Sequence, residues 1–252
     1  MAILTKNEMR QQVKQYVACP HPTKKYRADT LTILCDMWKA SQRNRVDLWG
    51  TISEYKHASS DNKINGNVIK GALRKFLQTR QKNRCCYCNR LLVNNAHAKP
   101  IEHILPRFQY PQFSLHFWNL AVACVDCNGT KLKEVWGSIS ADAKVYPPPA
   151  AFSDMYHPRF HAYKEHIKHV CIENDGCVVS IYKGITEQGR HLCLALLDKV
   201  AAKRILIESN DELQGAMSEI ATYQGKVGQI EASQLAELAE LINNSVLTLL
   251  NE

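Results

Sequence analysis

Apolar residues recur at helical spacing through the first eighty positions, most clearly in residues 67–81, "NVIKGALRKFLQTRQ". One face of that segment carries five apolar side chains: Val68, Ile69, Leu73, Phe76 and Leu77. Its basic side chains fall mostly elsewhere: Lys70, Arg74, Lys75 and Arg80. The pattern predicts an amphipathic helix that buries one side and exposes a basic one. Loops such as "SSDNKINGN" separate it from other helices predicted between residues 5 and 80.

After residue 84 the pattern changes to short apolar runs, turn residues and cysteines, which continue to about residue 137. "VYPPPAAF" cannot continue a helix and predicts a linker at 145–152. "HIKHVCIENDGCVVSIYKG" predicts a β-hairpin that turns at Asn174–Gly176. Helices are predicted from about residue 186 onward. The last of them, "ASQLAELAELINNSVLTLLNE", carries an apolar stripe that either packs on the protein's own helices or docks on a partner.

These elements together predict an α+β chain that is mostly helical, arranged in three regions. Residues 1–83 form a helical, basic N-terminal region, residues 84–144 a central unit, and residues 153–252 a C-terminal region with a hairpin and helices. At 252 residues and 45% hydrophobic, the chain can bury a sizeable core. No apolar run has the length of a membrane span, and the N-terminus becomes polar too soon for a signal peptide. We therefore expect a cytoplasmic protein.

The formal net charge of +8 is unevenly distributed. Between Asp61 and Glu102 no acidic residue occurs, but nine basic ones do: Lys63, Lys70, Arg74, Lys75, Arg80, Lys82, Arg84, Arg90 and Lys99. From Glu208 onward eight acids face the single Lys226. This asymmetry favours one face for a polyanion such as nucleic acid, the alternative being an ordinary solvated helix face.

Four of the ten cysteines fall in two CxxC pairs. The members of the pairs are Cys85, Cys88, Cys124 and Cys127. Each two-residue gap lets a tight turn direct both sulfurs to one tetrahedral zinc ion, which would be structural because four thiolates leave no open position. Redox use is the alternative, and Cys86 could in principle replace Cys85 with poorer spacing. The other six cysteines are expected to be buried small apolar residues.

The insert between the two pairs contains the residues with chemistry. Glu102 and His103 place a hard oxygen ligand beside a side chain that can accept a proton at neutral pH. Asn119 follows sixteen residues after His103, and Asn128 comes directly after a cysteine, where a helix beginning "GTKLKE" could start. If both pairs bind one zinc, the strand of His103 and the start of that helix are brought together.

This order of residues, with "CCYCNR", "IEHILPR" and "WNLAVACVDCNGTK", resembles the HNH endonuclease family and its ββα-metal fold over roughly residues 84–137. The resemblance implies that His103 is the general base that deprotonates the attacking water. It implies that Asn119 tethers the loop and orients His103. Glu102 and Asn128 would bind one catalytic cation, Mg²⁺ or Mn²⁺, and hydrolysis would leave a 5′-phosphate and a 3′-hydroxyl. The chain departs from the commoner family residues, since Glu102 replaces Asp and Asn128 replaces His.

Simpler interpretations exist for each of these residues. His103 could be a core histidine whose hydrogen bonds are satisfied, and Asn119 could only cap a turn. Asn128 could only be the N-cap of the following helix. His97 and His116 are expected to be surface groups or to support the site from behind, and are not assigned to it.

A second resemblance lies further along the chain. "MYHPRFHAYKEHI", the hairpin, "GITEQG" and a Leu-rich helix with Arg204 are similar to the C-terminal portion of PtuB-like HNH proteins from Septu-type and retron-linked antiphage systems. In those systems the nuclease works with an ATPase, so the resemblance implies an ATPase partner and a role in antiphage defence.

The leading prediction is thus a metal-dependent nuclease that cuts DNA or, as the other possibility, RNA. The alternative is a non-enzymatic zinc module that binds nucleic acid. Phosphate contacts are expected from seven basic residues: Lys70, Arg74, Lys75, Arg80, Lys82, Arg84 and Lys131.

Overall fold

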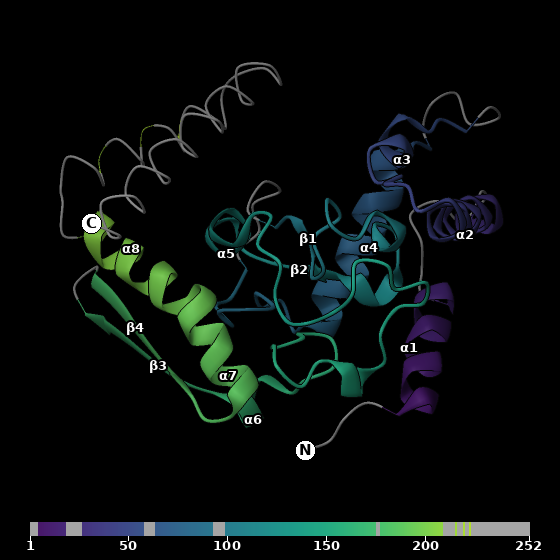
Figure 1. Ribbon diagram of the computed structural model, residues 1–252. Coiled ribbons are helices and arrows are strands. Elements are labelled where there is room, and N and C mark those ends of the chain that lie inside the picture. Colours follow the sequence, from purple (N-terminus) through teal and green to yellow (C-terminus); the bar gives the residue numbers. More distant parts are fainter. Residues whose placement is uncertain are drawn as a thin grey trace.

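The computed structural model describes residues 5–18, 27–57, 64–92, 99–174 and 177–208, together with the isolated positions 215, 219 and 222. It is an α+β structure, as predicted from the sequence. The N-terminal part contains α1 (Lys6–Ala18), α2 (Arg27–Asn44), α3 (Thr51–Glu54) and α4 (Gly66–Arg80), shown in Figure 1. In the part of the chain that is described, no helix combines the length and apolarity needed to cross a bilayer.

Helix α4 confirms the amphipathic helix predicted at 67–81. Asn65 caps its N-terminus, because the Asn65 side chain accepts a hydrogen bond from the Val68 amide at 3.1 Å. The buried face of the helix includes Ile69, Leu73 and Leu77. These side chains direct α4 against the centre of the molecule, where it contacts the second strand of the central sheet.

The centre of the fold is a two-stranded antiparallel sheet followed by a short helix. Strand β1 (Ile101–His103) pairs with β2 (Leu120–Val122), and α5 (Val125–Lys131) comes directly after β2. The connection between the strands contains two 3₁₀ turns, η3 (Pro111–Phe113) and η4 (Phe117–Asn119). This arrangement brings the residues of β1 and α5 to the same part of the fold (Figure 1).

Helix α5 begins earlier than its sequence predicts. We expected a helix starting near Gly129, but α5 starts at Val125 because the Cys124 Sγ caps it, accepting from the Cys127 amide at 3.4 Å. The helix ends at Lys131, and Leu132 follows with a φ of 46°. The interpretation of Asn128 as an N-cap is therefore wrong, since Asn128 lies within the helix.

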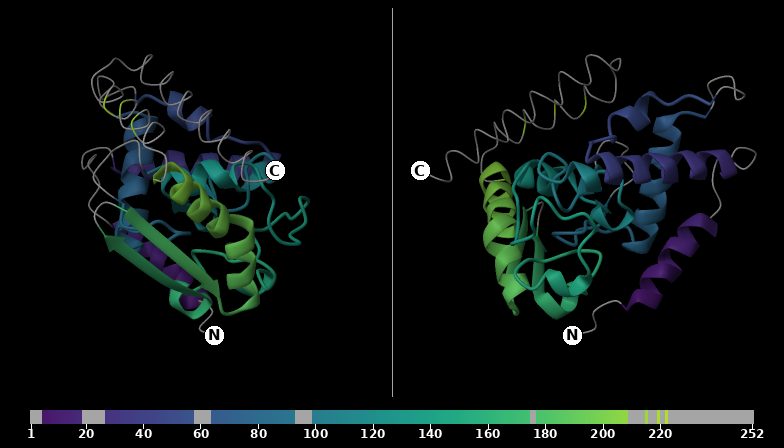
Figure 2. Two further views of the ribbon diagram at one scale, coloured as in Figure 1. Left: turned by 90° about the vertical axis from the view of Figure 1, so that its left-hand side faces the viewer. Right: turned by 45° about the vertical axis from the view of Figure 1, so that its right-hand side comes forward.

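The C-terminal part confirms the predicted hairpin. After α6 (Tyr163–His166), β3 (Ile167–Asn174) and β4 (Cys177–Gly184) pair antiparallel, with Asn174 opposite Cys177. Then follow α7 (Glu187–Leu192), the π-helical turn η6 (Cys193–Leu197) and α8 (Asp198–Glu208). Helix α8 contacts both β4 and α5. The hairpin and α8 lie on one side of the central unit, and α1 and α2 lie on the other (Figures 1 and 2).

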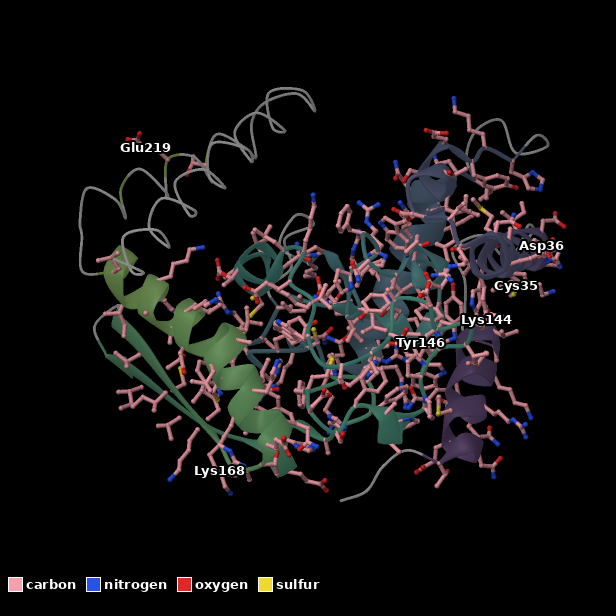
Figure 3. The ribbon with its side chains drawn as sticks, in the orientation of Figure 1. Cys35, Asp36, Lys144, Tyr146, Lys168 and Glu219 are labelled. Carbon is pink, nitrogen blue, oxygen red and sulfur yellow. The ribbon has the colours of Figure 1, made fainter. Side chains whose placement is uncertain are left out.

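One hydrophobic cluster extends from Tyr16 to Val200 and includes the central sheet. Tyr146 and Phe152 belong to it, so these two side chains anchor the segment 145–152, which the sequence predicts as a linker, to the core. The physical reason is that its aromatic side chains are buried, even though its prolines prevent a regular helix. Figure 3 places Tyr146 among the interior side chains. The division into three regions remains a prediction.

The cysteines outside the CxxC pairs do not all follow expectation. Cys86 and Cys193 are buried as predicted, whereas Cys35 and Cys171 are exposed. Figure 3 labels Cys35 at the periphery of α2. Cys35 and Cys171 are on outward positions of a helix and a hairpin, and composition alone does not reveal those positions. Cys19, the side chain of Cys177 and the predicted C-terminal helix at 230–252 lie outside the described residues.

Candidate metal and active site

The four cysteines of the CxxC pairs converge in the core. Their sulfur atoms all lie within 4.8 Å of one another, and the sulfurs of Cys88 and Cys124 are 3.8 Å apart. A tetrahedron with Zn–S bonds of about 2.3 Å separates its sulfurs by about 3.8 Å. The cluster therefore has the spacing and the ligand chemistry of a four-thiolate zinc site. Cys85, not its neighbour Cys86, belongs to the cluster, as its spacing predicted.

Two basic side chains, Arg90 and Lys203, lie near this cluster and offset the negative charge that four thiolates and zinc would carry. Four thiolates around Zn²⁺ carry a net charge of −2, which is costly in a buried position unless cations lie nearby. Arg90 pairs with Asp126 on α5, and Lys203 of α8 lies 3.9 Å from the same carboxylate. Burial lowers the pKa of Arg90, but the negative charges of Cys124 and Asp126 outweigh it and raise that pKa overall.

Glu102 lies on β1 with its carboxylate buried. Its Oε1 accepts hydrogen bonds from the Lys131 ammonium at 2.8 Å and the Tyr87 hydroxyl at 3.1 Å. No partner of the second oxygen, Oε2, is found among the described residues. Lys131 is itself fully buried, also donates to the His103 carbonyl at 3.2 Å, and lies over the Trp136 ring. Because Lys131 is buried and paired with Glu102, it cannot contact phosphate at the surface. This corrects the sequence prediction for Lys131.

His103 follows Glu102 on β1 and is half-buried. Its Nε2 lies 2.9 Å from the carbonyl oxygen of Ser114. A carbonyl can only accept, so Nε2 carries the ring proton and Nδ1 is the unprotonated nitrogen. No hydrogen bond to Nδ1 is found among the described residues. Burial lowers the pKa of His103 to about 4, so the imidazole is neutral near pH 7. The Trp49 ring packs edge-on against it, with centroids 4.8 Å apart.

Asn119 is fully buried and links two segments that position His103. Its Oδ1 accepts from the Leu105 amide at 2.8 Å, and its Nδ2 donates to the carbonyls of Leu105 and Phe113 at 2.9 and 3.0 Å. Leu105 lies two residues after His103, and Phe113 precedes the serine whose carbonyl binds the imidazole. Asn119 therefore ties the loop after β1 to the turn that orients the ring, which is more than a single turn cap.

A buried polar chain supports Asn119 from behind. His157 Nδ1 accepts from the Arg159 amide at 3.3 Å, so His157 Nε2 carries the proton and donates to the Tyr146 oxygen at 2.8 Å. The Tyr146 hydroxyl hydrogen is then available to the Asn119 Oδ1 or the Trp118 carbonyl, each 3.3 Å away. Sequence reasoning did not connect Tyr146 and His157 with the site, since neither lies near its motifs.

His116 packs beside the same chain. Its ring is buried and stacks on Tyr146 with centroids 4.2 Å apart, and burial lowers its pKa to about 3. It is therefore a buried supporting group and not a surface residue. His97 lies outside the described residues.

Asn128 lies on α5 and lines one cavity together with Glu102 and His103. That cavity has a volume of about 460 Å³. A carboxylate and an amide oxygen are ligands that suit Mg²⁺ or another hard cation, so the chemistry of the donor set fits such an ion. The structure brings Glu102, His103 and Asn128 to one cavity, whereas Asn119 is buried and is not part of its lining.

Eight further residues line the cavity, and sequence reasoning assigned none of them to the site: Asp47, Trp49, Ile101, Pro106, Arg107, Phe108, Leu132 and Lys133. Asp47 pairs with Arg107 and accepts from the Trp49 amide at 2.9 Å. Asp47 and Trp49 come from the connection between α2 and α3, so the N-terminal region supplies one wall of the cavity. Arg107 and Phe108 directly follow "HILP", and this proximity was the one available signal.

The predicted basic face of α4 is divided by the fold. Four of the seven predicted phosphate contacts are exposed: Lys75, Arg80, Lys82 and Arg84. Lys70 is half-buried and donates to the Trp49 carbonyl at 2.7 Å and to the Ser53 hydroxyl, and burial lowers its pKa to about 8. Arg74 is also half-buried. Lys70 thus holds the cavity wall in place, and the exposed cations lie on the later part of α4 and the turn after it.

Comparison with known proteins gives one informative similarity. The chain is 33% identical over 69 residues to the Septu protein PtuB of Bacillus thuringiensis. The match covers 27% of this chain and 27% of that protein. No protein-family profile matches the chain, and no solved structure matches it significantly.

Proposed function

We propose that the protein is a metal-dependent HNH endonuclease that hydrolyses phosphodiester bonds of nucleic acid. The observation that carries the proposal is the geometry of His103. Its Nε2 is bound to a backbone carbonyl, and it lines one cavity with Glu102 and Asn128. The order β1, β2, α5 beside four converging cysteines supports the ββα-metal interpretation of residues 84–137.

In this proposal His103 is the general base. Because Nε2 donates to the Ser114 carbonyl, the ring is fixed in one orientation and Nδ1 is the acceptor for a proton of the attacking water. After transfer, the imidazolium keeps its bond to Ser114, since both nitrogens are then donors. Asn119 acts as a positioning residue, because its bonds to Leu105 and Phe113 keep the ring in this geometry.

Glu102 and Asn128 are the residues that would hold a catalytic Mg²⁺ or Mn²⁺. When bound, such an ion supplies stabilisation of the charge on the scissile phosphate and on the leaving 3′-oxygen. The chain's own part is to orient the carboxylate: Lys131 and Tyr87 bind Oε1 of Glu102. The Lys131 ammonium, 2.8 Å from Oε1, is the countercharge of this buried carboxylate.

The similarity to Septu protein PtuB supports a role in antiphage defence. By the same resemblance, we propose that the protein works with an ATPase subunit. The match covers about a quarter of either chain. The defence role and the ATPase partner are therefore proposed from the match together with the C-terminal motifs quoted above.

The second candidate function is a non-enzymatic zinc module that binds nucleic acid through its exposed cations. The four-cysteine cluster and the basic residues after α4 would serve it equally well. Such a module has no use for an imidazole, a carboxylate and an amide that line one cavity, which is why we favour the nuclease.

Incubation with plasmid DNA, single-stranded DNA and transfer RNA in Mg²⁺ or Mn²⁺ tests the proposal. We expect cleavage of at least one substrate, dependent on the divalent ion, that leaves 5′-phosphate and 3′-hydroxyl ends. Matched reactions without added divalent ion serve as the control. Binding without cleavage of any substrate, with and without co-purifying proteins, would favour the zinc module.

A charge reversal tests the basic surface. We expect Lys75→Glu, Arg80→Glu and Lys82→Glu together to weaken binding and to flatten its salt dependence, because each lost phosphate contact removes about 0.9 from the slope of log K against log salt. The control carries the same change at Lys144, Lys168 and Lys183, which are equally exposed but lie elsewhere. Figure 3 labels Lys144 and Lys168 on opposite sides of the molecule. Equal slopes in both triple variants would make the basic side of α4 an ordinary solvated face.

A further inference from the structure

Phe108 is a large apolar side chain that is exposed to solvent on a hydrogen-bonded turn. Its side chain is 75% exposed. The turn is closed by the amides of Gln109 and Tyr110, which donate to the Pro106 carbonyl at 3.0 and 2.9 Å. Pro106 is buried, and Tyr110 is buried with its hydroxyl bonded to the Ile139 carbonyl at 2.7 Å. The exposure of Phe108 is therefore imposed by the neighbouring backbone.

The position of the ring distinguishes it from other exposed apolar residues. Single exposed apolar side chains are common and need no explanation. Val145 and Leu194 are 71% and 72% exposed, but neither lines the cavity. Phe108 lines the same cavity as His103. The Lys133 ammonium lies 5.4 Å from the centroid of its ring, and Arg107 precedes it in the chain.

An aromatic face beside cations is the arrangement that binds unpaired nucleotides. Every base has a π-face that can stack on such a ring, and the ammonium of a lysine attracts the adjoining phosphate. Asp47 already neutralises part of the charge of Arg107, so Lys133 supplies most of this attraction. In a duplex both faces of a base are covered by its neighbours, so only an unstacked base presents its face to an exposed ring.

We propose that Phe108 stacks a base of single-stranded nucleic acid and so leads that strand into the cavity of His103. This inference rests on the proposed nuclease function, which places the reaction at His103. It specifies the substrate class as single strands, which includes loops and unpaired ends. The stacking chemistry is common to DNA and RNA.

Binding of fluorescein-labelled oligothymidylate, oligouridylate and a blunt DNA duplex of equal length tests this, measured by anisotropy without added divalent ion. The full-length protein is compared with Phe108→Ala, Phe108→Trp and the equally exposed control Val145→Ala. We expect Phe108→Ala to weaken binding of the single strands about tenfold, since stacking of one base has an effect of this order. Phe108→Trp should retain binding, duplex affinity should change little, and Val145→Ala should bind like the parent.

Each other outcome is decisive. A loss confined to one of the two single strands supports stacking and identifies which of these two polymers binds at Phe108. Unchanged single-strand binding by Phe108→Ala overturns the proposal, as does an equal loss on the duplex or no binding of either single strand by the parent. Because no cleavage is needed, failure here leaves the nuclease proposal standing, and absence of cleavage with intact stacking rejects the nuclease alone.

Discussion

His103→Ala is expected to abolish cleavage of nucleic acid while binding and folding stay close to those of the parent protein. Loss of a general base removes a contribution of roughly 10² to 10⁴ in rate. The fold should tolerate the change because the ring is half-buried and, among the described residues, its hydrogen-bond partner is the Ser114 carbonyl. Initial cleavage rates at saturating substrate, with anisotropy for binding and a thermal melt for folding, measure the three effects separately.

The matched control is His169→Ala. His169 is also half-buried, lies on β3 and stacks on Tyr182 with centroids 4.6 Å apart, but it does not line the cavity. The His169→Ala variant should cleave nucleic acid at the parent rate. If purified, folded His103→Ala cleaves as fast as this control, His103 is a core histidine and the assignment of the base is wrong.

Cys127→Ser is expected to lose zinc and folding stability together. Metal binding at a four-thiolate site contributes on the order of 10 kcal/mol to local folding, because the ligands converge only in the folded state. Cys127 is fully buried in the cluster and lies on α5, so its loss should also disturb the helix that carries Asn128. Zinc content per chain by mass spectrometry and the melting transition are the measurements, and cleavage should fall as a consequence.

Cys86→Ser is the control for this change. Cys86 is buried and adjacent in sequence to the cluster, yet its sulfur is not one of the four that converge. We expect it to keep one zinc per chain with at most a modest loss of stability. A Cys127→Ser protein that keeps its zinc and melts sharply would contradict the four-thiolate site. Loss of zinc in Cys86→Ser would show that Cys86, and not Cys85, is the ligand.

The features that could be predicted from the sequence depend on short-range order. The two CxxC pairs, the apolar face of α4 and the existence of the β3–β4 hairpin all follow from the spacing of residues within one segment. A thiolate pair at two-residue spacing suits one tetrahedral ion, and apolar periodicity marks a buried face, whatever lies elsewhere in the chain. The convergence of His103, Glu102 and Asn128 on one cavity agrees with the motif, whereas their catalytic roles stay predictions.

Only the tertiary structure decided which charged and aromatic residues share that cavity. Lysine side chains are usually exposed, but the fold buries Lys131 against Glu102. Lys70 donates a hydrogen bond to the Trp49 carbonyl and so supports Trp49. Trp49 reaches His103 from a connection more than fifty positions earlier in the chain. Ion pairs, buried polar chains and cavity walls form between segments that are distant in sequence. Their partners depend on packing in three dimensions, about which the local pattern of residues carries no information.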